Sequence, residues 1–253
     1  MNVKIPYFFL LSLCYFIFAT NSDAQPIVYT AANAHSHNDY EQSIPFALAC
    51  QEGFGSIEAD IHLVDGLLLV GHDSKDLKKD RTLEHLYLKP INLLGDSVRK
   101  LQLMIDIKTD AVATIQALID LLKQYPKIIQ SDYVSIVISG NRPEPALYSS
   151  YPDFILFDGR LEQRYTTDAL KKIAMLSEDF SKFTDNKSEK PNSEKVKNRI
   201  RNAIKMAHEW NKPVRFWGNP DYPKGWEELM NLGVDYINTD HIQQLAEYLK
   251  KRK

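Results

Sequence analysis

Cysteine is nearly absent from this chain of 253 residues, which contains only Cys14 and Cys50. Cys14 lies in an apolar N-terminal segment, and bulky Leu13 precedes it where a lipoprotein signal would need a small residue. If that segment is removed as a signal, Cys50 remains alone and no disulfide can form within the chain. The exported domain must then be stabilised by its own hydrophobic core.

The sequence also lacks an apolar run long enough to span a membrane. The segment that follows Lys4 is apolar only from about residue 6 to residue 19, and a spanning helix needs roughly 18–20 such residues. Ser22 and Ala24 are small residues of the kind found before a signal-cleavage site. We therefore expect a signal peptide over residues 1–24, a mature domain over 25–253, and a secreted or periplasmic protein without a stable membrane anchor.

Long basic blocks and glycine-rich phosphate-binding loops are missing too. The formal net charge is −2, and no long basic block lies near an aromatic cluster, so nucleic acid is not an expected partner. No glycine-rich fingerprint follows the first predicted strand, which disfavours a doubly wound dinucleotide-binding sheet without excluding an open sheet.

Short β-branched runs alternate with segments of helical periodicity over the mature chain. The predicted strands lie at 27–32, 55–61, 101–107, 133–139, 153–158, 173–177, 214–218 and 234–239. The clearest predicted helices lie at 110–125, 193–211, 225–233 and 240–253. Eight strands with helical or loop crossovers predict parallel pairing in an α/β fold, a TIM-type (βα)8 barrel in a single domain. An extra strand at 67–73 is expected to form a hairpin with the second strand through Asp65-Gly66.

Alternation along the predicted strands brings acids to one face. In the second strand Glu58, Asp60 and His62 share a face, opposite an apolar face. Asp106 and Lys108 are placed in the same way on the next strand, as are Arg215, Trp217 and Asn219 near the C-terminus. Unpaired buried carboxylates cost several kcal/mol each, so they need a cation, a base or a proton.

Glu58, Asp60 and Asp106 therefore predict a site for a hard divalent ion with oxygen ligands, Ca²⁺ or Mg²⁺. Four of the 7 histidines lie between His35 and His72, interleaved with these acids. A histidine-rich surface loop, or a solvated antiparallel face, would be the inert explanation of the same pattern. Lys108 is expected to neutralise excess negative charge or to contact an anionic substrate.

These motifs resemble a known superfamily. His37-Asn38 in "SHNDY", Glu58-x-Asp60, His72 in "GHD" and Asp106-x-Lys108 are similar to the phosphatidylinositol-phospholipase-C-like phosphodiesterases, which include glycerophosphodiester phosphodiesterases. The stretches "AHSHNDY", "EAD", "LLVGHD", "DIK", "GNRP", "VRFW" and "INTD" more closely resemble the altered inheritance of mitochondria protein six family. The resemblance extends from about Asn33 to Leu249.

The resemblance implies a metal-dependent phosphodiesterase with a TIM-type barrel and catalysis at the C-terminal ends of the barrel strands. It implies general acid–base roles for His37 and His72, and substrate contacts for Lys108 and Trp217. The implied metal ligands are Glu58, Asp60 and Asp106, with Asn38 as an additional ligand. The implied substrate is a small phosphodiester, glycerophosphodiester-like or phosphoinositide-like.

The sequence departs from the family pattern at the first strand, where no Arg-Gly follows either histidine. His35 is therefore a rival of His37 for the first catalytic position. Asn141 and Arg142, in "SGNRPEP", either contact phosphate or form a turn.

Two other functions remain open from the sequence. His35-x-His37 also fits an amidohydrolase-type zinc site, although no histidine occurs between His85 and His208 to complete it, and Asp240 is the only other matching feature. A barrel that binds a phosphate or sugar ligand without catalysis is the second alternative.

Overall fold

The computed structural model describes residues 28–184 and 193–252. The expected signal peptide over residues 1–24 lies outside the described residues. Within the described residues, no helix is both long enough and apolar enough to cross a bilayer.

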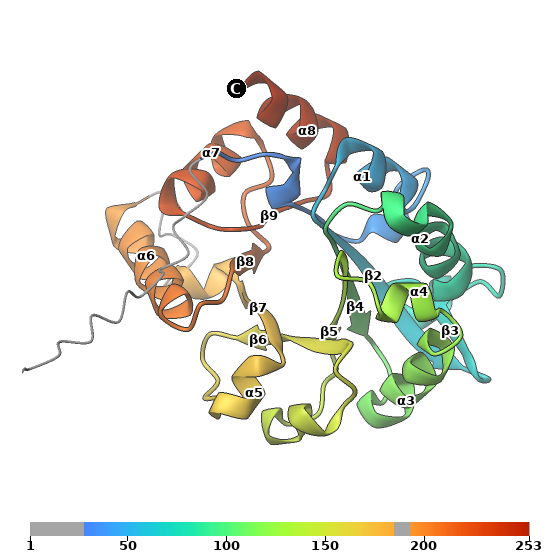
Figure 1. Cartoon of the computed structure of the whole chain (residues 1–253). Coiled ribbons are helices and arrows are strands. Elements are labelled where there is room, and N and C mark those ends of the chain that lie inside the picture. The colour runs from blue at the N-terminus through green and yellow to red at the C-terminus, as the bar shows by residue number, and fades with distance from the viewer. Residues whose placement is uncertain (1–27, 185–192, 253) are drawn as a thin grey trace, which may run out of the picture.

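Eight parallel strands form a nearly closed barrel in the order β8-β7-β6-β5-β4-β2-β1-β9 (Figure 1). They are β1 (Ala34–Ser36), β2 (Ser56–Val64), β4 (Leu101–Ile107), β5 (Val134–Gly140), β6 (Ile155–Arg160), β7 (Ile173–Asp179), β8 (Val214–Trp217) and β9 (Ile237–Thr239). A single parallel bridge between Arg215 and Tyr236 joins the two ends of the sheet. The expected α/β barrel is confirmed.

The ninth strand, β3 (Leu67–Val70), pairs antiparallel with β2, as the hairpin prediction required. Asp65 and Gly66 have φ values of 50° and 78°, the left-handed conformation that a two-residue turn between twisted strands demands. The hairpin extends the C-terminal end of β2 and leads the chain to His72.

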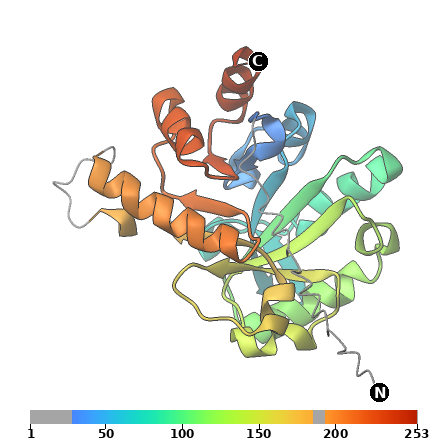
Figure 2. The same ribbon diagram turned by 60° about the vertical axis from the view of Figure 1, so that its left-hand side comes forward.

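Helices surround the barrel on its outside (Figures 1 and 2). They are α1 (Ala47–Glu52), α2 (Lys89–Leu94), α3 (Ala111–Leu122), α4 (Pro126–Ile129), α5 (Thr167–Lys171), α6 (Glu194–Glu209), α7 (Pro223–Leu232) and α8 (Ile242–Lys251). The 3-10 segments are η1 (Ala31–Asn33), η2 (Asp39–Glu41), η3 (Ser74–Asp76), η5 (Gly95–Ser97), η6 (Pro145–Ser150) and η7 (Phe180–Phe183), and η4 (Glu84–Leu88) is a π-helix. Side-chain caps start the two longest helices, Asp110 for α3 and Ser193 for α6.

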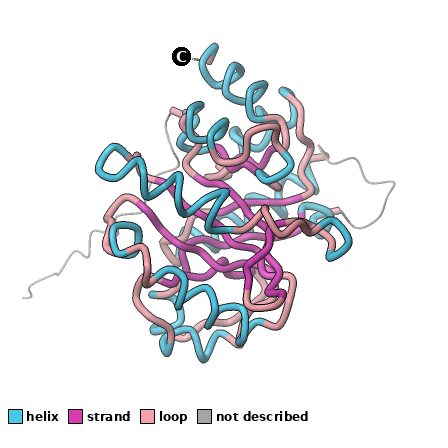
Figure 3. Tube along the Cα trace, turned by 90° about the vertical axis from the view of Figure 1, so that its right-hand side faces the viewer, coloured by secondary structure: helices cyan, strands magenta, loops and turns pink. Residues whose placement is uncertain are grey.

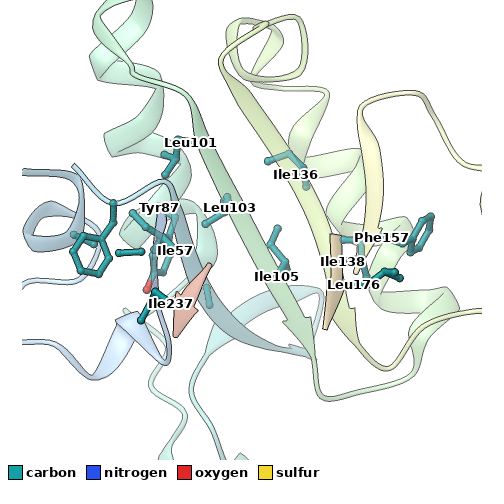
Figure 4. Packing of buried hydrophobic residues seen from close by; sticks show 14 of the residues in the cluster. Ile57, Tyr87, Leu101, Leu103, Ile105, Ile136, Ile138, Phe157, Leu176 and Ile237 are labelled. Carbon is teal, nitrogen blue, oxygen red and sulfur yellow. The ribbon is translucent and has the colours of Figure 1, made fainter. Parts of the chain in front are cut away.

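Most of the core lies between the barrel and the helices. Outward-facing strand residues such as Ile57, Ile105 and Phe157 are fully buried there against helical partners (Figure 4). Burying such a side chain contributes about 1.5–3 kcal/mol. A smaller separate cluster of Met104, Val137 and Met175 fills the inside of the barrel. Figure 3 shows the strands at the centre of the molecule with helices around them.

The first strand begins later in the chain than the sequence predicts. The predicted strand at 27–32 is wrong, because Thr30 caps η1 with its side chain and turns residues 31–33 into a 3-10 segment. The strand is instead Ala34–Ser36, which pairs with β2 and β9 despite having no β-branched residue. The last strand is also shorter than predicted, because the N–H groups of Asp235 and Tyr236 both donate to Val214 O before β9 begins.

Candidate active site

A cavity of about 490 Å³ opens at the C-terminal ends of the strands. Its walls are formed by His37, Asn38, Glu58, His72, Asp106, Ile107, Lys108, Ser139, Gly140, Asn141, Arg160, Arg215 and Trp217. The strand order explains this grouping, because parallel strands deliver their C-terminal residues to one end of a barrel. Most residues that the sequence singles out therefore meet around one hollow.

The acid trio, defined as Glu58, Asp60 and Asp106, lies at the base of this end. Asp60 on β2 is the direct register partner of Asp106 on β4, so their side chains lie side by side. One carboxylate oxygen from each member of the trio lies within 4.8 Å of the others. The alternation argument is confirmed for these three residues: they converge, and all are largely buried.

Glu58 is held from beneath by two buried side chains. Its Oε2 accepts from Arg215 Nη1 at 2.7 Å and lies 2.7 Å from His35 Nε2. Burial alone would raise the pKa of Glu58, but the Arg215 guanidinium and the His35 hydrogen bond hold it well below its usual range. Glu58 is thus a carboxylate whose orientation is fixed.

Asp60 is saturated on one oxygen and unpartnered on the other. Its Oδ2 accepts from Tyr40 Oη at 2.9 Å, His72 Nδ1 at 3.0 Å and Lys108 Nζ at 3.0 Å. Its buried Oδ1 has no hydrogen-bond partner within residues 28–184 and 193–252. A buried acceptor without a partner is costly, and a cation bound by the trio would satisfy it. The residues present therefore fit a hard divalent ion.

Asp106 and Lys108 complete the floor of the cavity. Lys108 Nζ lies 2.9 Å from Asp106 Oδ1 and also contacts Asp60. Burial lowers the pKa of Lys108, but the two aspartates outweigh it and raise that pKa above its ordinary value. Burial and the charge of Glu58 raise the pKa of Asp106. Three carboxylates crowded together thus retain excess negative charge beside one lysine.

His37 and His72 flank the cavity, and each is backed by a carboxylate. His37 Nδ1 lies 2.8 Å from Asp240 Oδ1, and its side chain is 27% exposed. His72 Nδ1 lies 3.0 Å from Asp60 Oδ2, and its side chain is 57% exposed. Burial lowers the pKa of His37, but the hydrogen bond that it donates to Asp240 and the charge of Glu58 raise that pKa above the ordinary value. With Nδ1 as donor in both rings, each Nε2 is left for another partner.

His35, the rival of His37, has a different environment. It is fully buried beneath Glu58, with Nδ1 2.7 Å from Ser56 Oγ and Nε2 2.6 Å from Arg215 Nη1. Burial, with the charge of Arg215, lowers the pKa of His35 to about 4. Its contact with Glu58 is therefore a hydrogen bond that the neutral ring donates to the carboxylate, rather than an ion pair. The structure brings His37, and not His35, to the cavity.

Asn38 and Trp217 also line the cavity, as the resemblance implied. Asn38 has a left-handed backbone with φ of 44°, and its Oδ1 accepts from Tyr40 Oη at 3.0 Å. The Trp217 ring stacks under a guanidinium, with Arg160 Cζ 4.6 Å from its centroid. His62 lies at the edge, where its Nε2 donates to the backbone oxygen of His72 at 3.1 Å.

Several residues of the site have no role in the sequence prediction. Arg215 was placed on the inner face only by alternation. Asp158 ends a predicted strand without comment, and Arg160 lies two residues beyond it. Asp240 was considered only as a feature of the zinc-site alternative. The alternation of Asp158 and Arg160 in "FDGR" is the same signal that identified Glu58 and Asp60. Nothing local in the sequence predicts that Tyr40 would reach Asp60.

Solved structures support the same barrel architecture. A glycerophosphodiester phosphodiesterase from Parabacteroides distasonis superposes with a TM-score of 0.59 at 17% identity, covering 87% of this chain and 97% of that one. A glycerophosphodiester phosphodiesterase from Agrobacterium tumefaciens superposes with a TM-score of 0.51 at 14% identity, covering 86% of this chain and 96% of that one. At these identities the likeness establishes the fold.

Sequence comparisons identify the family. Residues 23–97 match the AIM6-like phosphodiesterase domain, and residues 213–243 match the glycerophosphoryl diester phosphodiesterase family. An altered inheritance of mitochondria protein 6 homolog from Arthroderma benhamiae is 30% identical over 85% of this chain and 82% of its own length. The protein of that name from Eremothecium gossypii is 27% identical over 85% of this chain and 68% of its own length. The chain therefore belongs to the altered inheritance of mitochondria protein 6 family.

Proposed function

We propose that the protein is a metal-dependent phosphodiesterase that cleaves a small glycerophosphodiester-like or phosphoinositide-like diester by general acid–base catalysis with His37 and His72. The observation that carries this proposal is the buried acid trio with one unpaired oxygen, flanked by two carboxylate-backed histidines. The family match to a phosphodiesterase domain supports the same chemistry.

The trio would hold the cation, with Asn38 as an additional oxygen donor at the wall of the cavity. All of these donors are oxygens, which favours Ca²⁺ or Mg²⁺ over zinc. When bound, such an ion supplies positive charge to a phosphate oxygen whose negative charge grows in the transition state.

The two histidines would divide the proton transfers. Asp240 and Asp60 each fix an Nδ1 tautomer and orientation, so that an Nε2 can exchange a proton with the substrate. One histidine removes the proton of the attacking hydroxyl, and the other protonates the leaving oxygen. Positioned proton transfer of this kind contributes on the order of 10²–10⁴ in rate. Water as the nucleophile gives a monoester, and a hydroxyl of the substrate gives a cyclic phosphate.

Lys108 and Trp217 would bind the substrate. Lys108 already bridges Asp60 and Asp106, so its charge stabilises the crowded carboxylates and attracts the anionic diester. The charged cavity and its position at the strand ends fit a polar small molecule.

Hydrolysis assays would separate the candidate functions. We expect bis-p-nitrophenyl phosphate and glycerophosphodiesters to be cleaved with Mg²⁺ or Ca²⁺ and to resist cleavage after EDTA treatment. Zinc-dependent cleavage of amides alone would instead support the amidohydrolase alternative. A barrel with no turnover under any divalent ion, yet with measurable phosphate binding, would be a ligand-binding protein.

We also propose that the protein acts outside the cytoplasm, on the basis of its N-terminal sequence. Mass spectrometry of the protein recovered from its own cell envelope or medium should give an N-terminus at Gln25. Recovery of the intact chain from the cytosol would contradict this.

A further inference from the structure

The wall of the cavity opposite the histidines has a charge pattern of its own. Arg160, at the end of β6, is fixed by its Nη1, which donates to Asp158 Oδ2 at 2.7 Å and to Gly159 O at 3.2 Å. Its guanidinium lies over the Trp217 ring and lines the cavity, with the side chain 21% exposed. Its Nε and Nη2 have no hydrogen-bond partner in the part of the chain that the structure describes.

A second arginine adds to this positive charge. Arg142 Nη1 donates to the backbone oxygen of Asp158 and lies 3.9 Å from Asp158 Oδ2. Asp158 is fully buried, and its Oδ2 also accepts from Ser139 Oγ at 3.0 Å. Two guanidinium groups thus face a single carboxylate and leave an excess of one positive charge.

Acidic side chains also lie near this wall. Glu178 on the neighbouring β7 pairs with Lys182 at 3.0 Å, and Lys182 also pairs with Glu162 at 3.0 Å. Burial lowers the pKa of Arg160, but Asp158, Glu178 and, from the acid trio, Asp106 raise it. Arg160 is therefore always charged, and its unused N–H groups can bind an anion.

The spacing places this wall within reach of the leaving group of a bound diester. Asp106 on β4 pairs with Ser139 on β5, and Ser139 contacts Asp158 on β6. The backbones of β4 and β6 are thus two strand spacings apart, about 10 Å, and the Arg160 side chain covers part of that gap. A diester whose phosphate is held at the acid trio has room to place one of its two ester groups beside Arg160 and Trp217, which both line the cavity.

We propose that Arg160 and Trp217, with Arg142 behind them on the shared Asp158, form an anion subsite that selects phosphodiesters whose alcohol carries a second negative charge, such as a carboxylate. This inference rests on the proposed phosphodiesterase function and adds a substrate class to it. A cationic alcohol such as choline would be repelled by the two arginines, although the tryptophan by itself would attract it.

Glycerophosphoserine and glycerophosphoethanolamine test the subsite, because they differ only by one carboxylate. We expect kcat/KM to be about tenfold or more higher for the serine diester, the ratio that one charge-assisted contact supplies. Arg160→Met should reduce this ratio to about 1. Arg160→Lys, which keeps the positive charge but lacks the planar guanidinium with its paired N–H donors, should give an intermediate ratio. Arg164→Met is the matched control, because Arg164 does not line the cavity, and it should keep the wild-type ratio.

A binding measurement separates failure of the subsite from failure of catalysis. O-phosphoserine and O-phosphoethanolamine are titrated while tryptophan fluorescence is followed, with Trp217→Phe to assign the signal. We expect phosphoserine to bind about tenfold or more tightly, even if no diester is hydrolysed. Should Arg160→Met fail to fold in a thermal melt, Arg160→Lys and Trp217→Phe still decide the question. Equal affinities for the two monoesters, or a wild-type kcat/KM ratio near 1, would overturn the subsite.

Discussion

The barrel has two cavities of similar size at its opposite ends, and only one has the features of an active site. The cavity at the C-terminal ends of the strands has a volume of about 490 Å³, and the one at the N-terminal ends has about 470 Å³. The N-terminal cavity is lined in part by Gln102, His208, Lys212, Asp235 and Tyr236. Volume and the presence of polar residues therefore do not distinguish the two ends.

The difference lies in whether the polar groups are already satisfied. At the N-terminal end, His208 Nε2 lies 2.8 Å from Asp235 Oδ2, and Lys212 Nζ donates to Ile173 O at 2.7 Å. No buried side-chain oxygen or nitrogen there lacks a partner, among the described residues. At the C-terminal end, Asp60 Oδ1 has none and three carboxylates converge. The C-terminal end of the barrel, with its unpaired carboxylate oxygen and its three close carboxylates, is therefore the end expected to bind a ligand.

Substitution of Asp60, whose Oδ1 has no partner among the described residues, should remove the clearest difference between the two ends of the barrel. We expect Asp60→Asn to lower kcat/KM for bis-p-nitrophenyl phosphate by about 10³-fold or more, because several kcal/mol of charge stabilisation disappear. Mg²⁺ or Ca²⁺ should raise the melting temperature of the wild type and not that of the variant. Asp120→Asn, an exposed change on α3, is the control. Activity of Asp60→Asn within tenfold of the wild type would contradict the metal site.

The histidine substitutions should have the next largest effect. His37→Gln and His72→Gln are each expected to lower kcat by about 10²–10⁴-fold with little change in stability, because both rings lie at the cavity. His35→Ala should instead cost about 1–3 kcal/mol of unfolding free energy, since it leaves buried partners unpaired. Steady-state kinetics and thermal melts on the same preparations compare the three. If His35→Ala alone removed activity without destabilising the fold, His35 would be the base.

Much of this contrast could be predicted from the sequence, because it depends on strand alternation. Glu58-x-Asp60 and Asp106-x-Lys108 lie in regular strands, where a period of two and parallel pairing bring side chains to one end of a barrel. The same alternation correctly separated Ile57 and Ile105 into the outer core. The strands between residues 101 and 218 were predicted to within two residues, whereas β2 continues to Val64, three residues past its predicted end.

The remainder depends on contacts that no local pattern encodes. Ala34–Ser36 is a strand only because β2 and β9 pair with it on both sides, whereas the β-branched Val28 and Thr30 before it are not in a strand. Arg215 lies 157 residues from Glu58 in the chain, and Asp240 lies 203 residues from His37. Assigning His37 rather than His35 to the cavity required knowing which residue lies beneath Glu58.

Substitution of Arg215 tests how far the acid trio depends on the buried side chain that holds Glu58. Arg215→Met should lower the free energy of unfolding by about 3–5 kcal/mol, because it leaves Glu58 buried without its cation. It should also weaken divalent-ion binding or activity by about 10–100-fold, as is typical when a residue that orients a metal ligand is lost. Urea unfolding and metal titrations measure the two effects. The double variant Arg215→Met/Glu58→Gln should recover part of the stability, and additive losses would contradict the coupling.

Substitutions in the N-terminal cavity should have the smallest effect on activity of all the variants. We expect His208→Gln and Lys212→Met to leave kcat/KM for bis-p-nitrophenyl phosphate within twofold of the wild type, since neither residue lines the cavity of the acid trio. Lys212→Met loses one hydrogen bond to Ile173 O, about 0.5–1.5 kcal/mol. Burial already lowers the pKa of Lys212, so replacing its charge with an apolar side chain offsets part of that loss. Melting temperatures and initial rates on the same samples check both statements. A tenfold loss of activity in either variant, at unchanged melting temperature, would show that the two ends of the barrel are functionally linked.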